Sequence, residues 1–328
     1  MASFVDHLGP DPKQNQGRWE RCYQNPVIPF GADWSREFIA PSSVLVEGEL
    51  ITLFAEGGAD DRECIGRYTT TTQRFLSTDW TPDHRNPILE PSLRGFDRGS
   101  VFDPAVIRFG EKTHLYYSAT AGGAHAFAER FDSGDDYHPE DEVIGLAVET
   151  ELGFSRRPMP VVVGRCPNVI EADGTLTLFY VDVVDGGYRI YAARSSDGIH
   201  FEPLSANPVL DVGGSGAWDS FTVTTPKVFV DDGAFVMLYS GDSTRIDDPT
   251  GIGVAVSDDL VHWRKHPGNP ILAPGRHGAF DSLSVANAVP FLVHDAWYIA
   301  YAGGARPVAD GLQSQIGIAR LVEAGAGD

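Results

Sequence analysis

Apolar and polar residues alternate in short runs along nearly the whole chain. The runs are rich in β-branched and aromatic side chains, and Gly, Asp or Asn residues separate them. Side chains of the first kind favour strands, and the separating residues favour turns. No segment keeps a helical spacing of apolar positions over several turns. The pattern therefore predicts an all-β protein made of short strands.

One motif recurs with constant internal spacing: an aromatic residue, then Asn-Pro six positions later, then two aliphatic residues. Four copies span residues 19–28, 80–89, 201–210 and 263–272, and a degenerate copy lies near residues 154–161. Between the copies, three more short strands recur, and the third often carries Ile-Gly. Five units of four short strands predict a single five-bladed β-propeller.

The ends of the chain predict how the ring closes. The fifth unit ends after its third strand, and residues 18–22 look like the fourth strands of other units. We expect residues 18–22 to pair with residues 315–321, which would remove an exposed sheet edge. The expected organisation is a flexible segment at 1–17, a propeller at 18–322 and a flexible tail at 323–328.

Charge and cysteine content exclude some classes of function. The formal net charge of −21 disfavours nucleic acid and anionic membranes as partners. No apolar run reaches the roughly 18 residues of a membrane span, and residues 1–17 lack the features of a signal peptide. The three Cys residues lack the spacing of a metal site. We therefore expect a cytoplasmic protein with neither nucleic acid nor membrane as a partner.

A site is expected at the centre of one face of the propeller. The inner strands start around a central opening, and the loops after the second strands reach the same face. Asp103 lies at the start of an inner strand, just before a Pro. Three other carboxylates end second strands, namely Glu56, Asp182 and Asp242. The longest loop of that face, residues 119–142, carries His125.

The Asn-Pro motifs and the stretch Ser-Asp-Asp-Leu-Val-His-Trp at residues 257–263 resemble a known group of enzymes. These are the five-bladed propeller glycoside hydrolases of families 43, 32 and 68, with the related mannoside phosphorylases of family 130. The resemblance covers residues 18–321 and implies sugar cleavage by two carboxylates with a third, supporting Asp. Relatives can hold a structural Ca²⁺ at the propeller centre, and whether this protein also binds one there stays an open question. This sequence has no dedicated ligand cluster, so neither cofactor nor metal is expected.

One of the three implied carboxylates stands where the resemblance places it. Asp103, in Val-Phe-Asp-Pro, matches the supporting Asp, whereas Ala40 and Arg165 occupy the other two positions. An acid and a base are both needed for hydrolysis, so other carboxylates would have to serve with Asp103. The candidates for this catalytic set are Glu56, Asp182 and Asp219.

Asp219 has a second interpretation. It recurs with Asp97 and Asp281 in Phe-Asp or Trp-Asp pairs ahead of three inner strands. Because the pair recurs, a role in a turn or in a hydrogen bond between blades is favoured over a catalytic role for Asp219.

Substrate-binding candidates are chosen for charge or for their place on the open face. Arg165 and Lys227 could hold a carboxylate or a phosphate, although in so acidic a chain Arg165 also suits a salt bridge to a neighbouring Asp. Trp34 could stack on a sugar ring or pack within a blade. The remaining candidates are Glu37, Asp242, His125 and Asn287.

Three hypotheses of function follow. The first is a glycoside hydrolase that cleaves a small soluble glycoside, such as a glycosylated metabolite, with a non-standard carboxylate set. The second is a glycoside phosphorylase similar to family 130, in which inorganic phosphate replaces the missing base. The third is a propeller that binds a sugar without cleaving it or serves a diverged biosynthetic reaction. All three predict a small carbohydrate as partner, and the oligomeric state stays open.

Overall fold

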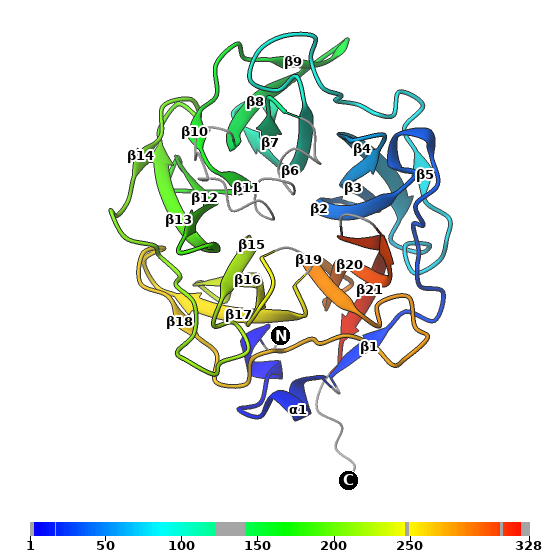
Figure 1. Cartoon of the computed structure of the whole chain (residues 1–328), viewed down its shortest axis with the longest axis vertical. Helices are drawn as coiled ribbons and strands as arrows, with labels where there is room; N and C mark the ends of the chain where they lie inside the picture. Colours follow the sequence, from blue (N-terminus) through cyan, green and yellow to red (C-terminus); the bar gives the residue numbers. More distant parts are fainter. Residues whose placement is uncertain (1–2, 17, 123–141, 247–248, 309–310, 323–328) are drawn as a thin grey trace.

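The computed structural model describes residues 3–16, 18–122, 142–246, 249–308 and 311–322. Its strands form five antiparallel sheets arranged as blades around a common centre (Figure 1). The five-bladed propeller predicted from the repeats is therefore confirmed. No helix in the described ranges is long and apolar enough to cross a membrane.

Each blade runs outward from the centre in chain order. Blade 1 contains β2 (Phe38–Glu47), β3 (Leu50–Ala59), β4 (Arg62–Thr71) and β5 (Thr81–Pro82). Blade 2 contains β6 (Ser100–Phe109), β7 (Lys112–Thr120) and β8 (Glu142–Thr150), and β8 pairs with both β9 (Gly153–Arg156) and β10 (Val162–Val163). Blade 3 contains β11 (Arg165–Ala172), β12 (Thr175–Val184), β13 (Gly187–Ser195) and β14 (Glu202–Pro203).

The last two blades complete the ring. Blade 4 contains β15 (Thr222–Asp231), β16 (Ala234–Asp242), β17 (Gly251–Ser257) and β18 (Arg264–Lys265). Blade 5 contains β19 (Ser284–Val293), β20 (Ala296–Val308), β21 (Gly311–Leu321) and, as its outer strand, β1 (Trp19–Arg21). Trp19 pairs with Leu321 and Arg21 with Ala319, which confirms the predicted closure by the N-terminal strand.

The recurrent Asn-Pro motif closes the outer side of a blade. In three copies, the Asn side chain accepts a hydrogen bond from the N–H of a third-strand residue and donates one to its C=O, as a neighbouring strand would. These pairs are Asn25 with Ile318, Asn86 with Arg67, and Asn269 with Val254. The following aliphatic residues then bridge to the same third strand. The constant spacing of the motif thus reflects one hydrogen-bonded unit.

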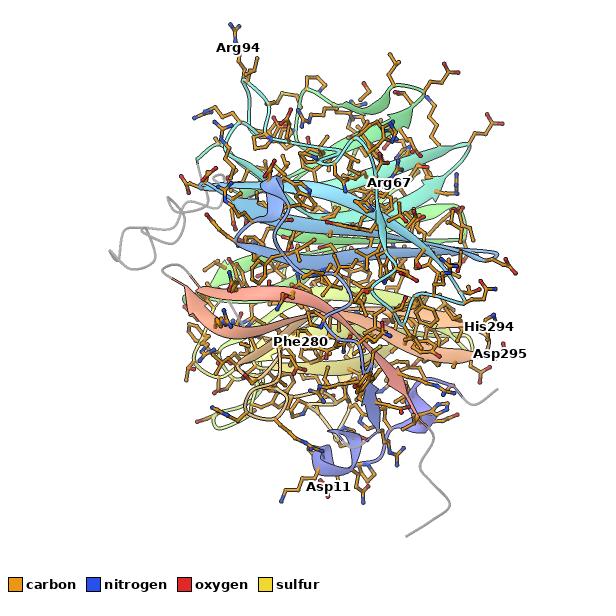
Figure 2. All side chains as sticks on the ribbon, turned by 90° about the vertical axis from the view of Figure 1, so that its right-hand side faces the viewer. Asp11, Arg67, Arg94, Phe280, His294 and Asp295 are labelled. Carbon is orange, nitrogen blue, oxygen red and sulfur yellow. The ribbon has the colours of Figure 1, made fainter. Side chains whose placement is uncertain are left out.

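The N-terminal residues pack against the propeller instead of forming the expected flexible segment. They contain η1 (Val5–His7) and α1 (Pro12–Gln16), and Figure 2 shows Asp11, next to α1, at the opposite end of the long axis from Arg94. Phe4 is fully buried against Trp19, Phe229 and Trp297. Burial of this ring stabilises the packing of the residues around Phe4 against the propeller.

The hydrophobic core lies between the blades. Five clusters of buried aliphatic and aromatic side chains fill the five interfaces between neighbouring blades. Near the centre, Ala40 of β2 and Ala286 of β19 pack with Ala302 of the second strand β20 as a small cluster. Polar side chains occupy the rest of this central region, so the packing of the blades positions them.

Bulges interrupt the inner strands near their starts. In blades 2 to 5 the bulge residues have positive φ, from 48° to 52°, and they are Asp103, Cys166, Thr225 and Asn287. Few non-glycine residues adopt this conformation, which turns the side chain and the N–H out of the regular ladder. Asp103 and Asn287 therefore lie at the bulge, three residues inside their strands, and not at the strand starts that the sequence indicated.

The register corrects one sequence alignment. Ala40 pairs with Glu56 and Phe102 pairs with Ser118, so Ala40 corresponds to Phe102. Pro41, not Ala40, therefore occupies the place of Asp103 in blade 1. Sequence alone aligned the two Pro residues. In both blades three residue steps of the inner strand face two steps of the second strand, so the bulges are equally long and the Pro of blade 1 lies one position earlier.

Candidate active site

Hydrogen bonds between blades surround the central opening. In three interfaces, the N–H of a bulge residue donates to a side chain on the second strand of the preceding blade. Asp103 N donates to Glu56 Oε2 at 2.6 Å, Cys166 N to Ser118 Oγ at 2.8 Å, and Asn287 N to Ser240 Oγ at 3.1 Å.

The three acceptors occupy equivalent positions, because each pairs with the Ile of a third strand. Blade 5 has Ala302 at this position, and the next inner strand has Pro41, which carries no N–H to satisfy. In blades 2 and 4 a Ser accepts this hydrogen bond. Accepting the bond therefore does not require the carboxyl group that Glu56 supplies in blade 1.

Glu56 and Asp103 form a buried carboxyl pair. Glu56 also accepts a hydrogen bond from Asn287 Nδ2 at 3.0 Å, and Ser118 Oγ donates to Asp103 Oδ2 at 2.9 Å. Burial, followed by the charge of Asp103, raises the pKa of Glu56 well above its usual range. Two adjacent buried carboxyls resist double ionisation, so the raised pKa of Glu56 favours its protonated form above the pH at which a free Glu loses its proton.

Arg165 joins this pair to a third buried carboxylate. Its Nη1 lies 3.1 Å from Glu142 Oε1 and donates to the hydroxyl of Tyr188 at 2.9 Å, while its Nε lies 3.8 Å from Asp103 Oδ2. The guanidinium also stacks against the rings of Phe102 and Tyr188, at 4.9 and 5.4 Å. The salt-bridge interpretation of Arg165 is therefore supported, and the side chain is held in one orientation.

Lys227 places a second cation near the carboxyl pair. Its side chain is buried, and it makes neither a hydrogen bond nor an ion pair with any described residue. Burial lowers the pKa of Lys227, and the negative charges of Asp103 and Glu56 oppose that decrease. Lys227 is thus available to an anionic ligand.

Cys166 lies in the same region and is poorly suited to act as a nucleophile. Burial, followed by the charge of Asp103, raises the pKa of the Cys166 thiol well above its usual range. The thiol therefore stays protonated near neutral pH, and the protonated form is a weak nucleophile.

Glu142 is the main residue that the sequence analysis missed. It is the first residue of β8, its side chain is 1% exposed, and the sequence shows it only as the end of a long loop. No motif marks it, because its position depends on the pairing of β8 with β7. With Glu56 and Asp103, it brings the number of carboxyl groups at the centre to three.

Asp219 contacts residues of its own blade instead of the central carboxyls, and a catalytic role for it stays a prediction. The hydroxyl of Tyr239 donates to Asp219 Oδ2 at 3.0 Å, and Lys265 Nζ lies 2.6 Å from the same oxygen. Two other blades repeat the arrangement, with Asp97 between Tyr117 and Arg156, and Asp281 between Tyr301 and Arg21. The recurrence of these Asp residues reflects packing within blades.

Two candidates lie in the segment that leads into β2 of blade 1, Trp34 in η2 (Asp33–Ser35) and Glu37 just before β2. The indole of Trp34 covers Gly57 and Gly66, where an added Cβ would lie 2.7 and 2.3 Å from its ring atoms. Glu37 is exposed and accepts a hydrogen bond from the N–H of Asp60 at 3.3 Å. Packing within the blade therefore accounts for Trp34, and contact of either residue with a substrate stays a prediction.

The remaining candidates lie in other blades. Asp242 accepts hydrogen bonds from the N–H groups of Thr244 and Arg245, and these bonds with one from Thr250 outweigh burial and lower its pKa. Asp182 is half-buried on β12, and burial raises the pKa of its carboxyl. His125 lies outside the described residues.

No metal site is evident in the described parts of the chain. There, no group of three or more His, Cys, Asp or Glu side chains is placed to hold a metal ion. The cations that balance the central carboxylates are Arg165 and Lys227.

Comparison with proteins of known sequence finds a phosphorylase among the relatives. The chain is 28% identical over 230 residues to a 1,2-β-oligomannan phosphorylase of Thermoanaerobacter sp. (strain X514), and the matched region spans 66% of this chain and 68% of the relative. No family model matches the sequence. The similarity therefore connects the chain with an enzyme that acts on a mannoside.

Comparison with solved structures identifies the same fold. A thermostable family-43 glycoside hydrolase superimposes with a TM-score of 0.64 at 20% identity and covers 91% of this chain and 92% of its own. A second structure, from the GH130 family of mannoside phosphorylases and glycoside hydrolases that target β-1,2 mannosidic linkages in Candida mannan, gives a TM-score of 0.67 at 14% identity, with 94% and 96% covered. The chain thus has a propeller fold similar to that of glycoside hydrolases and phosphorylases.

Proposed function

We propose that this protein is a glycoside hydrolase that cleaves a small soluble glycoside at the central carboxyls. The observation that carries the proposal is the buried Glu56–Asp103 pair, in which the pKa of Glu56 is raised and Asp103 lies 3.8 Å from Arg165, which also contacts Glu142. A buried carboxyl with a raised pKa is suited to act as a general acid near neutral pH. The fold shared with glycoside hydrolases supports the same conclusion.

The proposed reaction uses the pair as acid and Glu142 as base. The pair gives its proton to the leaving oxygen while the bond from that oxygen to the anomeric carbon breaks. Glu142 takes a proton from the water that attacks the anomeric carbon, and solvent returns this proton to the pair. One water is consumed and one alcohol is released. Arg165 would keep Asp103 and Glu142 apart and oriented.

Phosphorolysis is the second candidate, and Lys227 favours it. This buried cation has no ion-pair partner among the described residues, so it could bind inorganic phosphate beside the carboxyl pair. Phosphate would then attack the anomeric carbon in place of water, and the product would be a sugar 1-phosphate. The similarity to an oligomannan phosphorylase agrees with this alternative.

The test is product release from a panel of aryl furanosides, aryl pyranosides and mannobioses, with and without inorganic phosphate. Wild type is compared with Asp103→Asn and with the control Asp258→Asn, whose side chain is 78% exposed. We expect free sugar to be released without phosphate, by wild type and the control only.

Other outcomes would change the conclusion. Sugar 1-phosphate formed only with phosphate would establish the second candidate. Full activity of Asp103→Asn would contradict the central site. Sugar binding without release of any product would support a non-hydrolytic propeller and contradict both enzymatic candidates.

A further inference from the structure

Blade 3 differs from blades 1, 4 and 5 on the face that it presents to the preceding blade. In blades 1, 4 and 5, an aromatic ring from the incoming loop covers glycines of the second and third strands. These sets are Trp34 over Gly57 and Gly66, Trp218 over Gly241 and Gly253, and Phe280 (Figure 2) over Gly303 and Gly317. In blade 3, only Gly164 connects β10 to β11, so this connection supplies no ring.

Larger side chains occupy the glycine positions of blade 3. The register places Asp182 where the second strands of the other three have Gly, and Tyr191 where their third strands have Gly. Tyr191 stacks on Tyr180 with ring centroids 5.9 Å apart and planes 24° from parallel. All three side chains are half-buried, so they present polar atoms at a partly open surface.

The polar atoms of these side chains have unused bonding capacity. The equivalent tyrosines of blades 2, 4 and 5 donate to a buried Asp, whereas the Tyr180 hydroxyl bonds to no described residue. Asp182 Oδ1 accepts the N–H of Val183, and its Oδ2 accepts no hydrogen bond from the part of the chain that the structure describes. Because both side chains are half-buried, these atoms can be reached by a bound ligand.

The chemistry of this group suits a neutral sugar. Sugar hydroxyls can donate to the carboxylate and to the tyrosine oxygen. The apolar face of a sugar ring can pack on Tyr191, whereas Gly164 already lies against the ring of Tyr180. An anionic ligand is disfavoured, because the nearby Arg189 is already bound to Asp211 at 2.7 Å and to the carbonyl oxygens of Tyr188 and Phe221.

The group also adjoins the central site. Val181, the residue before Asp182, pairs with Arg165, which contacts the central carboxylates. Asp182 therefore stands one strand outward from the residue that bridges Asp103 and Glu142. A saccharide bound with one ring at the centre could reach this group with its next ring.

We propose that Tyr180, Asp182 and Tyr191 form a second sugar subsite, which holds the ring next to the one cleaved at the centre. This inference rests on the proposed function and extends it, because it assigns a substrate of two or more neutral sugar rings. The subsite adds affinity for the longer sugar and takes no part in bond cleavage.

The test compares binding of mono-, di- and trisaccharides in calorimetry. The probes are mannose, β-1,2-mannobiose and β-1,2-mannotriose, with matched arabinosides and xylosides. The variants are Asp182→Asn and Tyr180→Phe, which keep the shape of the side chains. The controls are Asp185→Asn, in the exposed turn after β12, and Tyr23→Phe, whose side chain is fully exposed. We expect each subsite variant to lower the ratio of trisaccharide to monosaccharide affinity about tenfold, and the controls to leave it unchanged.

The outcomes separate this inference from the function on which it rests. If wild type cleaves the panel sugars and the variants keep the wild-type ratio, the subsite is refuted while the proposed function stands. If wild type neither binds nor cleaves any sugar, the proposed function fails and the subsite fails with it.

Discussion

Two sets of buried carboxylates in this propeller have opposite surroundings. Each member of the repeated set, Asp97, Asp219 and Asp281, receives a tyrosine hydroxyl and a cation from its own blade. Glu56 and Asp103 instead lie against each other across the interface of blades 1 and 2. Each repeated carboxylate has a cation within 3.3 Å, whereas Arg165 lies 3.8 Å from Asp103 in the central pair.

This difference supports a role in blade packing for the repeated carboxylates and the proposed catalytic role for the central pair. A buried carboxylate with its own cation and hydroxyl donor secures the packing of a blade. A buried pair that must share a proton reduces stability at neutral pH, and groups of this kind concentrate at functional sites. Ser118 and Ser240 show that the bonding role of Glu56 needs no ionisable group.

The largest expected effect comes from removing the proton of the central pair. Glu56→Gln keeps an oxygen to accept the N–H of Asp103 but cannot give a proton to a leaving group. We expect kcat on the cleaved glycoside to fall about 10²–10⁴-fold, with an unchanged circular dichroism spectrum. Retention of wild-type kcat would show that Glu56 is only a structural acceptor.

A repeated carboxylate should affect stability instead of activity. Asp219→Asn leaves Lys265 without its ion pair, and we expect the free energy of unfolding in urea to fall by about 2–3 kcal/mol. This is less than for a fully buried pair, because the Lys265 side chain is 25% exposed. The matched control is Asp258→Asn in the same blade. A stable but inactive Asp219→Asn would support a catalytic role for Asp219.

The pH dependence of stability should reveal Glu56. Its pKa is raised in the folded protein, so the neutral form stabilises the fold below the ordinary value of 4.5, and this contribution is lost as the pH rises toward the folded pKa. Glu56→Gln removes this titration. We expect the stability of wild type relative to Glu56→Gln to decline between pH 4 and 8, by at most about 1.4 kcal/mol per pH unit. A constant difference across that range would mean that Glu56 titrates normally.

The two serines around the opening provide the finest comparison. Ser118→Ala and Ser240→Ala each remove an acceptor for a buried N–H, so each should cost about 1–2 kcal/mol in unfolding free energy. Only the hydroxyl of Ser118 also donates to Asp103. We therefore expect kcat/KM to fall roughly tenfold in Ser118→Ala and to change little in Ser240→Ala. Equal losses of kcat/KM in the two variants would show that the hydrogen bond from Ser118 to Asp103 does not contribute to catalysis.

Most of the fold could be predicted from the sequence, because one hydrogen-bonded unit repeats. The side chains of Asn25, Asn86 and Asn269 make the same bonds to a third strand, so the chain must repeat their spacing. The burial of Phe4 could not be predicted, because no sequence pattern links it to the rings of Phe229 and Trp297, which lie far away in the chain.

The site could be predicted only in part. The convergence of Glu56, Asp103 and Asn287 follows from propeller geometry and was foreseen. Glu142 was missed because its contact with Arg165 depends on strand pairing and on no local motif. The contacts of Asp219 could not be predicted, because its partners Tyr239 and Lys265 lie far from it in the sequence.

The central claim is that Glu56 and Asp103 act as one acid. The most direct measurement is kcat/KM on one cleaved glycoside for wild type, Glu56→Gln, Asp103→Asn and the double variant. Two groups that share one proton act as a unit, so replacing either one removes the same function. We therefore predict that the double variant loses no more kcat/KM than the worse single variant. Losses that multiply in the double variant would contradict the claim, because they would show that the two carboxyls act independently.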